Sequence, residues 1–466
     1  MKKIHKLVLS AFLIGSLVSC DKLSDFGDTN DNPAAVTNPV IGALLTNVQS
    51  GIASYASDTR GGLYSQYFSE TQYTDVSVYS TPELSFTGYY SGVLMDLQNI
   101  INSEESNNMT QIATILQQYI FWHITNLWGD VPYSEALQGA DALQPKYDTQ
   151  EDIYKGIFAK LGTAVNSFDN SQITGDIIYG GDVEAWKRAA NSLKAMAAIQ
   201  LSKKVPSASG FAATAFKEAL AGSGGVITTN AQNFEVNYPG GSFQSPVYSR
   251  YLTRQDYAES EPMVELLVSL DDTRQTKFGS SDVGVPYGLP RLEAEQFTSA
   301  NPDWALILAD DVRVDNSTVV IIGAAHVSFA RAEAANLGWT TENAETQYVN
   351  GITLSHEQWD VSMDPSYVTQ PEVALGSSTA ENYDKIALQN YIAHYPNGAM
   401  GWNIWRKTGV PTLTPAPAAT NTSGEIPRRY IYNQAEFSSN EASVLEAVGR
   451  LSGGNTQDAR VWWDQP

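Results

Sequence analysis

The chain has 466 residues, of which 51 are acidic and 28 basic, and its formal net charge at pH 7 is −23. A surface this anionic repels nucleic acids and anionic lipid headgroups, which argues against both as partners. The single cysteine rules out intramolecular disulfides. The length would suffice for two ordinary domains, but no Pro-, Ser- or Gly-rich linker divides the chain.

The N-terminus has the pattern of an export signal. Three lysines precede an apolar run, residues 7–17, that is too short to span a bilayer as a helix. Leu17-Val18-Ser19-Cys20 has the form of a lipobox, in which the cysteine thiol accepts the lipid. We therefore predict a signal peptide at 1–19, a lipid anchor on Cys20 and a polar tether at 20–36. Cleavage removes three lysines and no acids, so the mature net charge is 25 − 51 = −26.

Apolar residues after the tether recur at spacings of three and four, which predicts helices. The first covers about 44–55, with Pro39 at its first position and Thr37 or Asn38 as its cap, and the second covers about 90–101. A third runs from Ile112 to Leu127 with one apolar face. Gly129, which can adopt a positive φ, and Pro132, which cannot continue a helix, end it in a turn.

Capping residues mark further helices on both sides of a less regular region. Asp148 with Glu151 resembles a capping box, Asp182 precedes a helix over 186–201, and Ser378 with Glu381 precedes one over 383–391. Another helix is predicted at 344–359. Helices paired by short turns suggest TPR-like hairpins, although the 34-residue TPR signature is absent. Residues 225–320 are rich in Gly, Pro, Ser and aromatics, with short strand-like runs such as 319–322, and are typical of a loop-rich binding region.

Several motifs occur in a fixed order along the chain. They are LWGDVPYSEA at 127–136, DIIYGGDVEAWKRAANSLK at 176–194, GWNIWRKTG at 401–409, GEIPRR at 424–429 and WWD at 462–464. Together they resemble the SusD/RagB family of outer-membrane lipoproteins. The resemblance implies a mainly α, SusD-like fold, with TPR-like helical hairpins as a scaffold, few short strands, and a single domain over 37–466 whose ligand region is at about 225–320. It also implies display on the outer face of the outer membrane beside a SusC-like TonB-dependent transporter.

Motifs for catalysis are missing from the sequence. None of His123, His326, His356 and His394 belongs to an H-E-x-x-H pair, and there is no G-x-S-x-G elbow or phosphate loop. The acidic doublets Asp271-Asp272, Asp310-Asp311 and Glu293/Glu295 are more typical of solvated loops than of the carboxylate pair of a glycosidase. Asp310 or Asp311 could hold a structural calcium, but no D-x-D-x-D-G loop supports it. We predict no catalytic residues, no metal site and no cofactor.

Aromatic residues in loops carry the binding hypothesis. A sugar ring has an apolar C–H face and a rim of hydroxyls, so its site needs a flat aromatic ring with polar neighbours. Of the ten tryptophans only Trp304 lies in a loop, and the other nine are predicted to be in the core. The remaining candidates are Tyr287 and Arg291 in a Gly/Pro turn, Tyr73, Asp75 and Tyr79 in the segment 66–87, and Phe243.

The sequence thus favours a non-catalytic surface lipoprotein that binds an oligosaccharide or polysaccharide and passes it to the transporter. Neutral sugars suit the negative charge better than polyanionic glycans do. Two alternatives stay open. One is a peptide-binding member of the same family, since cationic peptides also suit the charge. The other, from a different class, is a surface glycoside hydrolase.

Overall fold

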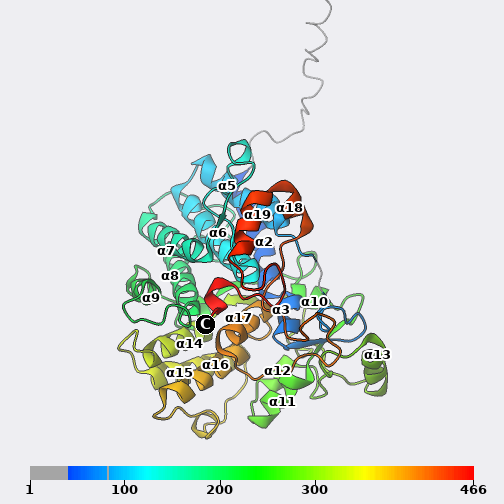
Figure 1. The fold of residues 1–466 in the computed structure, drawn as a ribbon. Coiled ribbons are helices and arrows are strands. Elements are labelled where there is room, and N and C mark those ends of the chain that lie inside the picture. The colour runs from blue at the N-terminus through cyan, green and yellow to red at the C-terminus, as the bar shows by residue number, and fades with distance from the viewer. Residues whose placement is uncertain (1–39, 81–82) are drawn as a thin grey trace, which may run out of the picture. The chain divides into compact units, whose positions relative to one another are not determined.

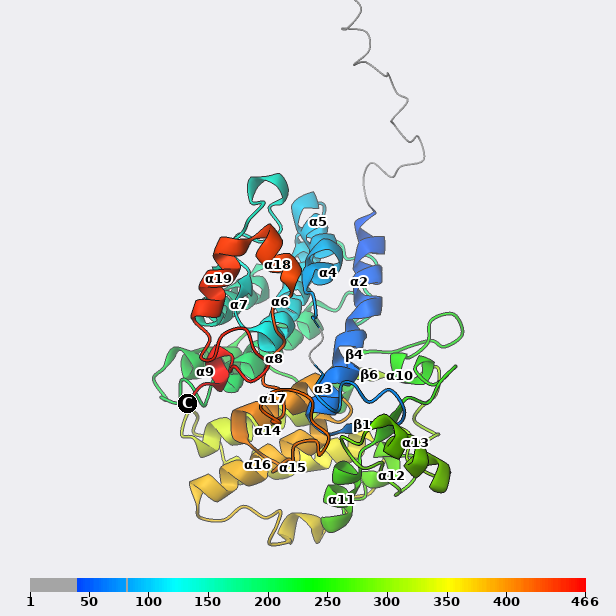
Figure 2. The same ribbon diagram turned by 45° about the vertical axis from the view of Figure 1, so that its right-hand side comes forward.

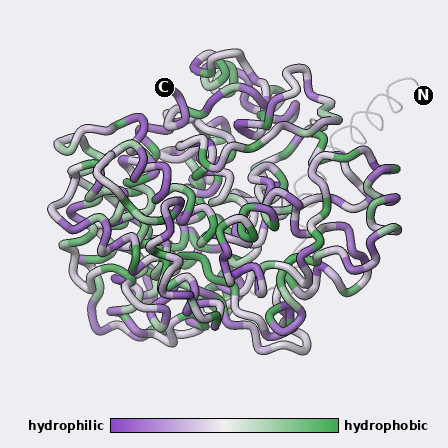
Figure 3. Tube along the Cα trace, turned by 90° about the horizontal axis from the view of Figure 1, so that it is seen from below, coloured by the Kyte–Doolittle hydropathy of each residue, from purple (hydrophilic) through white to green (hydrophobic). Residues whose placement is uncertain are grey.

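The computed structural model describes residues 40–80 and 83–466. The predicted signal peptide, Cys20, the tether and the cap at Thr37 or Asn38 lie outside the described residues. Residues 41–466 form one unit. Hydrophobic stretches run through its interior, and hydrophilic ones are common along its outer loops (Figure 3). None of the described helices is long and apolar enough to cross a bilayer.

The N-terminal part of the unit is helical, as the apolar spacing predicts (Figure 1). α6 packs on α7, α7 on α8, and α8 on α9, so successive helices form hairpins. The helices are α2 (Ile41–Ala56), α3 (Thr59–Tyr64), α4 (Thr87–Tyr89), a π-helical segment (Tyr90–Leu94), α5 (Met95–Ser103), α6 (Asn107–Trp128), α7 (Gln150–Ser167), α8 (Val183–Gln200) and α9 (Phe211–Ala221).

A second group of hairpins follows residue 320 and completes the scaffold. α14 packs on α15 and on α16, and α16 packs on α17, while α14 and α17 also contact α8. The four helices are α14 (Ala324–Asn336), α15 (Ala344–Gln358), α16 (Thr379–His394) and α17 (Gly398–Thr408). The predicted mainly α fold with TPR-like hairpins is confirmed.

The region between the two groups contains more helix than the sequence indicated. It includes α10 (Pro246–Ser249), α11 (Glu261–Ser269), α12 (Gln275–Phe278) and α13 (Arg291–Ala300), which gather on one side of the scaffold (Figure 2). Near the C-terminus α18 (Gln434–Ser439) packs on α19 (Glu441–Gly449).

Three antiparallel strand pairs connect segments that are distant in the sequence. β1 (Phe68–Glu70) pairs with β5 (Tyr257–Glu259), so that Phe68 lies opposite Glu259. The other pairs are β2 (Val131–Pro132) with β3 (Tyr147–Asp148), and β4 (Phe234–Val236) with β6 (Val319–Ile322). The strand predicted at 319–322 is therefore confirmed.

The capping predictions hold at two helices and fail at a third. Asp182 accepts from the N–H groups of Glu184 and Ala185, and Ser378 accepts from that of Glu381. The predicted box at Asp148 is wrong, because Thr149 caps α7. The Asp148 carboxylate instead accepts from the N–H groups of Tyr133 and Ser134, at 3.0 and 2.7 Å.

α6 ends at Gly129, whose φ is 92°, as predicted. The expectation of a single apolar face on this helix is wrong. Almost every residue of α6, including polar ones such as Gln118 and Asn126, is buried. Polar side chains can be buried here because they are hydrogen-bonded, as in the bond from the Tyr154 hydroxyl to Asn126 Oδ1 at 2.7 Å.

A buried ion pair fastens the loop-rich region to the scaffold. Arg274 Nη2 lies 2.5 Å from Asp272 Oδ2, and both side chains are fully buried. The guanidinium also donates to Ser355 of α15 and to Gln389 of α16, at 2.9 and 2.8 Å. Burial raises the pKa of Asp272, but the positive charge of Arg274 outweighs burial, so the pKa ends far below its usual range. The carboxylate is therefore ionised in the folded protein.

Replacement of Arg274 by methionine is expected to destabilise the protein by about 3–5 kcal/mol, because it leaves the buried Asp272 carboxylate without its counterion. Urea unfolding followed by tryptophan fluorescence measures the loss. Lys155→Met is the control, since Lys155 forms an exposed pair with Glu151 on α7 and its removal costs less than about 1 kcal/mol. Equal losses in the two variants would contradict the importance of the buried pair.

Candidate functional site

An open hollow lies where the β1–β5 pair meets α13. Its volume is about 750 Å³. The walls come from three segments: the exit of β1 at Thr71 and Gln72, the approach to β5 at 251–255, and α13 with the turn after it. Thr71 links the first two of these segments, since its N–H donates to Asp256 O at 3.0 Å and its hydroxyl donates to Gln255 O at 2.6 Å.

Tyr73 follows the lining residue Gln72 and lies between two arginines, of which Arg254 also lines the hollow. The guanidinium carbons of Arg254 and Arg291 lie 4.5 and 4.9 Å from the centre of its ring. Tyr73 itself is 46% exposed. Each arginine is paired with a carboxylate, Arg254 with Asp256 at 2.6 Å and Arg291 with Glu295 at 2.7 Å. The cluster thus offers a ring and N–H donors with little uncompensated charge.

α13 supplies the opposite wall. Arg291, Glu295, Thr298 and Ser299 recur at helical spacing on one face of it, and the last three line the hollow. The helix ends at Ala300, and the N–H of Trp304 donates to Asn301 O at 3.1 Å, which closes the following turn. This turn places the partly buried indole of Trp304 at the hollow.

The loop that carries Tyr73 is held from beneath by Glu70. Glu70 Oε2 accepts from the N–H groups of Val76 and Ser77, at 3.1 and 2.9 Å, and from the Ser77 hydroxyl at 2.8 Å. Burial raises the pKa of Glu70, while these hydrogen bonds favour its charged form. Since three donors converge on one buried oxygen, the loop has a fixed shape.

Four of the seven predicted ligand-binding residues come together in this structure. Trp304 lines the hollow, Arg291 packs on Tyr73 next to it, and Asp75 lies close enough to Arg291 for their charges to interact. Phe243 is exposed but does not line the hollow. It stacks on Tyr238, at 5.8 Å between ring centres.

The expectation that Tyr79 and Tyr287 display their rings is wrong. Tyr79 is fully buried and Tyr287 is 7% exposed, with 6.4 Å between their ring centres. Tyr79 Oη accepts from the N–H of Ala416, at 2.9 Å. The turn after Tyr287 approaches the same segment so closely that a Cβ on Gly288 would lie 2.4 Å from Ala416 Cβ. Both rings therefore pack beneath the site and have no free face for a ligand.

Sequence reasoning missed Arg254, Asp256, Thr298 and Ser299. The face of α13 could have been found from the spacing of four and seven residues after Arg291. The run Thr253-Arg254-Gln255-Asp256 carries no periodic signal, because its position depends on the pairing of β5 with β1.

Several of the acidic residues and histidines that the sequence singled out have structural roles. Asp310 pairs with Arg313 and Asp311 with Lys277, and Asp271 is exposed beside the buried Asp272. Across residues 40–80 and 83–466, no group of three or more His, Cys, Asp or Glu side chains is arranged to hold a metal ion. His123 is buried in the core among Tyr55 and Tyr89, and burial lowers its pKa to about 4.

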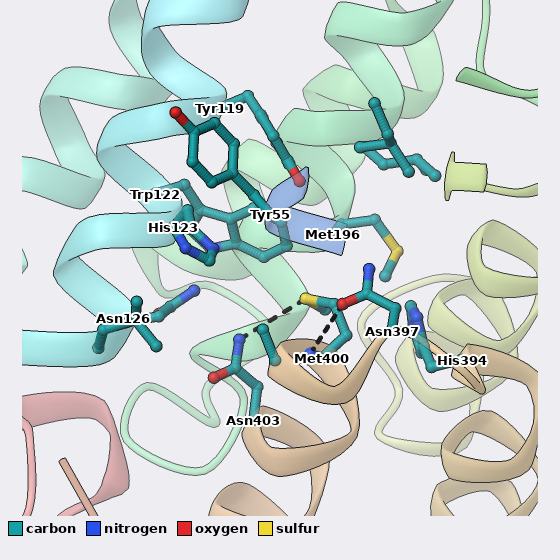
Figure 4. Close-up of a pocket in the computed structure, with 14 residues that line it drawn as sticks. Tyr55, Tyr119, Trp122, His123, Asn126, Met196, His394, Asn397, Met400 and Asn403 are labelled. Carbon is teal, nitrogen blue, oxygen red and sulfur yellow. Dashed lines mark hydrogen bonds between the residues drawn. The ribbon is translucent and has the colours of Figure 1, made fainter. Parts of the chain in front are cut away.

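The geometry suits a polyhydroxylated ligand. The ring of Trp304 can stack on the apolar face of a sugar, while Arg254, Thr298, Ser299 and Gln255 can bond its hydroxyls. An open hollow also admits a chain that is longer than the site. A separate pocket in the core, between Trp122, Met196 and Met400, measures only about 20 Å³ and is too small for such a ligand (Figure 4).

A family model described as SusD-like, "Starch-binding associating with outer membrane", matches residues 31–433. The chain belongs to the SusD-like family. No curated protein matches it.

Solved SusD homologues share the fold of this SusD-like chain. A chitin-binding SusD homologue from Flavobacterium johnsoniae has a TM-score of 0.80 at 24% identity, covering 92% of this chain and 99% of its own. A SusD homologue from Bacteroides uniformis has a TM-score of 0.80 at 23% identity, covering 91% and 99%. A further structure, named as a chitin-binding protein, has a TM-score of 0.77 at 24% identity and covers 91% and 100%. At these identities the likeness establishes the fold.

Glu259, which faces Phe68 in the strand pair behind the site, gives a pH prediction. It is fully buried, its Oε2 accepts from Gln275 Nε2 at 3.0 Å, and burial raises its pKa well above the usual value. The folded state therefore keeps a proton that the unfolded chain loses above about pH 4.3, so this residue's contribution to stability falls as pH rises. We expect Glu259→Gln, which cannot ionise, to be increasingly more stable than the wild type from about pH 5 to about pH 8.

Urea midpoints of variant and wild type at the two pH values test this expectation. Glu372→Gln, at an exposed position, is the control, and its difference from the wild type should stay constant. A Glu259→Gln difference that is independent of pH would show that the carboxyl is ionised in the folded protein.

Proposed function

We propose that this SusD-like protein is a surface lipoprotein that binds a neutral oligosaccharide or polysaccharide and passes it, chemically unchanged, to a SusC-like TonB-dependent transporter. The observation that carries the proposal is the indole of Trp304 on an open hollow whose other walls carry hydroxyl, amide and guanidinium groups, those of Thr298, Gln255 and Arg254 among them. The family description and two solved structures named as chitin-binding, one of them a SusD homologue, support a glycan as the ligand.

The charge of the site supports a neutral glycan over a polyanion. Both arginines are paired with carboxylates, so little positive charge is left for an acidic sugar. The whole chain is also strongly negative. Starch and chitin oligomers satisfy this condition, whereas pectin and sulfated glycans do not.

Binding without hydrolysis is supported by the roles of the nearby acids. Glu295 and Asp256 are each held in an ion pair with a guanidinium. A glycosidase needs one carboxylic acid free to give up a proton and a second free to attack or to activate water. Carboxylates that already bond arginines suit the orientation of ligand donors better than either task.

Delivery rests on the family and on the N-terminal pattern. The lipobox at Cys20 would anchor the protein to the outer membrane, and the tether at 20–36 would allow it to move over the transporter. In this proposal the helical hairpins contact the transporter, while the loop-rich side meets the ligand. A peptide ligand stays the alternative, since the anionic surface suits cationic peptides.

Replacement of Trp304 by alanine tests the glycan site. We expect the variant to lose retardation in native gels that contain soluble starch or glycol chitin, and its affinity for the oligomers in calorimetry to fall about tenfold or more, because the stacking platform is gone. Tyr73→Ala should have a similar effect. Phe243→Ala is the control, since Phe243 is exposed at a distance from the hollow.

The assay uses the mature chain from residue 21 and checks each variant by thermal unfolding. If the polymer retards the wild type and Trp304→Ala equally, the glycan site is not at this hollow. Binding of cationic peptides without binding of any glycan would favour the peptide alternative. Release of reducing sugar from the polymer would show a hydrolase.

A further inference from the structure

A second cavity runs from the surface into the molecule on the border between the loop-rich region and the scaffold. Its volume is about 560 Å³, within the range of small-molecule sites. It shares no lining residue with the hollow beside Trp304. Exposed residues, among them Asp311, Thr318 and Asp360, form its mouth, whereas its deeper wall is made by buried residues of α14 and α16.

Several buried polar atoms on residues that line this cavity have no hydrogen-bond partner in the described part of the chain. Among the described residues, buried side-chain atoms without a partner include six on residues that line the cavity: Asn230 Oδ1, Ser245 Oγ, Gln358 Oε1, Trp359 Nε1, and Nδ1 and Nε2 of His394. Leaving a buried polar atom unpaired is costly, and one cavity rarely gathers so many. Because these atoms have almost no accessible surface, a polar molecule in the cavity reaches them only when the side chains turn, and it can then supply the missing partners.

The two histidines in the deeper wall are neutral. His326 Nδ1 accepts from the N–H of Gly323 at 2.9 Å, so its Nε2 carries the proton that is donated to Ala393 O at 3.1 Å. His394 stacks on this ring at 3.7 Å between centres, and burial together with His326 lowers its pKa. A neutral imidazole has one N–H donor and one acceptor nitrogen. In His394 neither the donor nor the acceptor has a partner among the described residues.

The deeper end of the cavity borders the small core pocket. His394 and Asn397 line both, and in Figure 4 they lie at the edge of the core pocket beyond Met196 and Met400. That pocket is large enough only for a water molecule. A ligand in the cavity would therefore end at His394, against a wall of methionine and aromatic side chains.

The chemistry of the walls defines a class of ligand. Amide oxygens accept, the indole N–H donates, and the imidazole and the Ser245 hydroxyl can do both, which matches hydroxyl groups. None of these unpaired groups carries a charge. The charged lining residues are Glu235, Lys277, Asp311, Glu357 and Asp360, and since Lys277 is paired with Asp311, the balance is negative and disfavours anions.

We propose that this cavity is a second binding site, for a neutral polyhydroxylated small molecule of one or two sugar rings. The proposal does not depend on glycan binding at Trp304. If both sites are used, the protein holds a short saccharide internally while a polymer occupies the surface.

The test uses the mature Trp304→Ala chain, in which the surface site is already disabled. Calorimetric titrations at millimolar concentration use glucose, N-acetylglucosamine and maltose as probes, with glucuronate as the anionic comparison. We expect at least one neutral probe to bind, and Gln358→Leu or Trp359→Phe to weaken it about three- to tenfold by removing one hydrogen bond. Gln370→Leu, at a half-buried position outside both cavities, should leave binding unchanged.

Three results would overturn the proposal. They are no binding of any neutral probe, binding that Gln358→Leu and Trp359→Phe leave intact, and glucuronate binding as tightly as glucose. A crystal of the same chain soaked in the best probe checks the position independently, and sugar density away from His394 would also overturn it. A failure of the proposed surface site would be seen in a separate experiment. In that case neither starch nor glycol chitin would retard the wild-type protein in a native gel.

Discussion

The structure depends on the contact between the end of α6 and a segment some three hundred residues later. The buried guanidinium of Arg429 donates to Trp128 O at 3.2 and 3.1 Å through Nε and Nη2. The N–H of Tyr430 donates to Leu127 O at 2.8 Å, and the Trp128 indole to Ile431 O at 3.2 Å. These bonds satisfy carbonyl groups that the end of a helix leaves free, so the corner at Gly129 needs the C-terminal segment for completion. The family motifs at 127–136 and 424–429 thus serve packing.

A second buried cation fixes the neighbouring elements in the same way. The guanidinium carbon of Arg406 in α17 lies 3.7 Å from the ring centre of Trp402 and 4.8 Å from that of Trp463. Trp463 Nε1 in turn donates to Asn126 Oδ1 of α6 at 2.9 Å. Because the closing WWD motif and the GWNIW motif meet here, the C-terminus of the chain is part of the core of the scaffold. A rigid scaffold of this kind leaves the loop-rich side free to vary in shape.

The cavity that ends at His394 lies where the loop-rich region joins the scaffold, whereas the hollow beside Trp304 lies within the loop-rich side. The pairing of β1 with β5 brings Tyr73 next to Arg254, and the Asp272–Arg274 pair fastens the chain before α12 to α15 and α16. Loop side chains held by such buried contacts lose little freedom on binding a ligand. The proposed surface site would present the Trp304 ring to an extended chain, whereas the cavity that ends at His394 would enclose a short molecule. The two differ in shape more than in chemistry.

The sequence by itself determined several helices of the scaffold, because spacing and caps such as Asp182 and Ser378 act within a few residues, and the order of its motifs indicated the family. It also indicated that Tyr73 and Trp304 lie in loops, whereas Arg291, which was expected in a Gly/Pro turn, begins α13. Only the tertiary structure decided that Tyr79 and Tyr287 are buried, that Arg254 flanks Tyr73, and that a cavity ends at His394. The exposure of a side chain depends on what covers it, and the covering segments, 251–256 and 414–420 among them, are distant in the sequence.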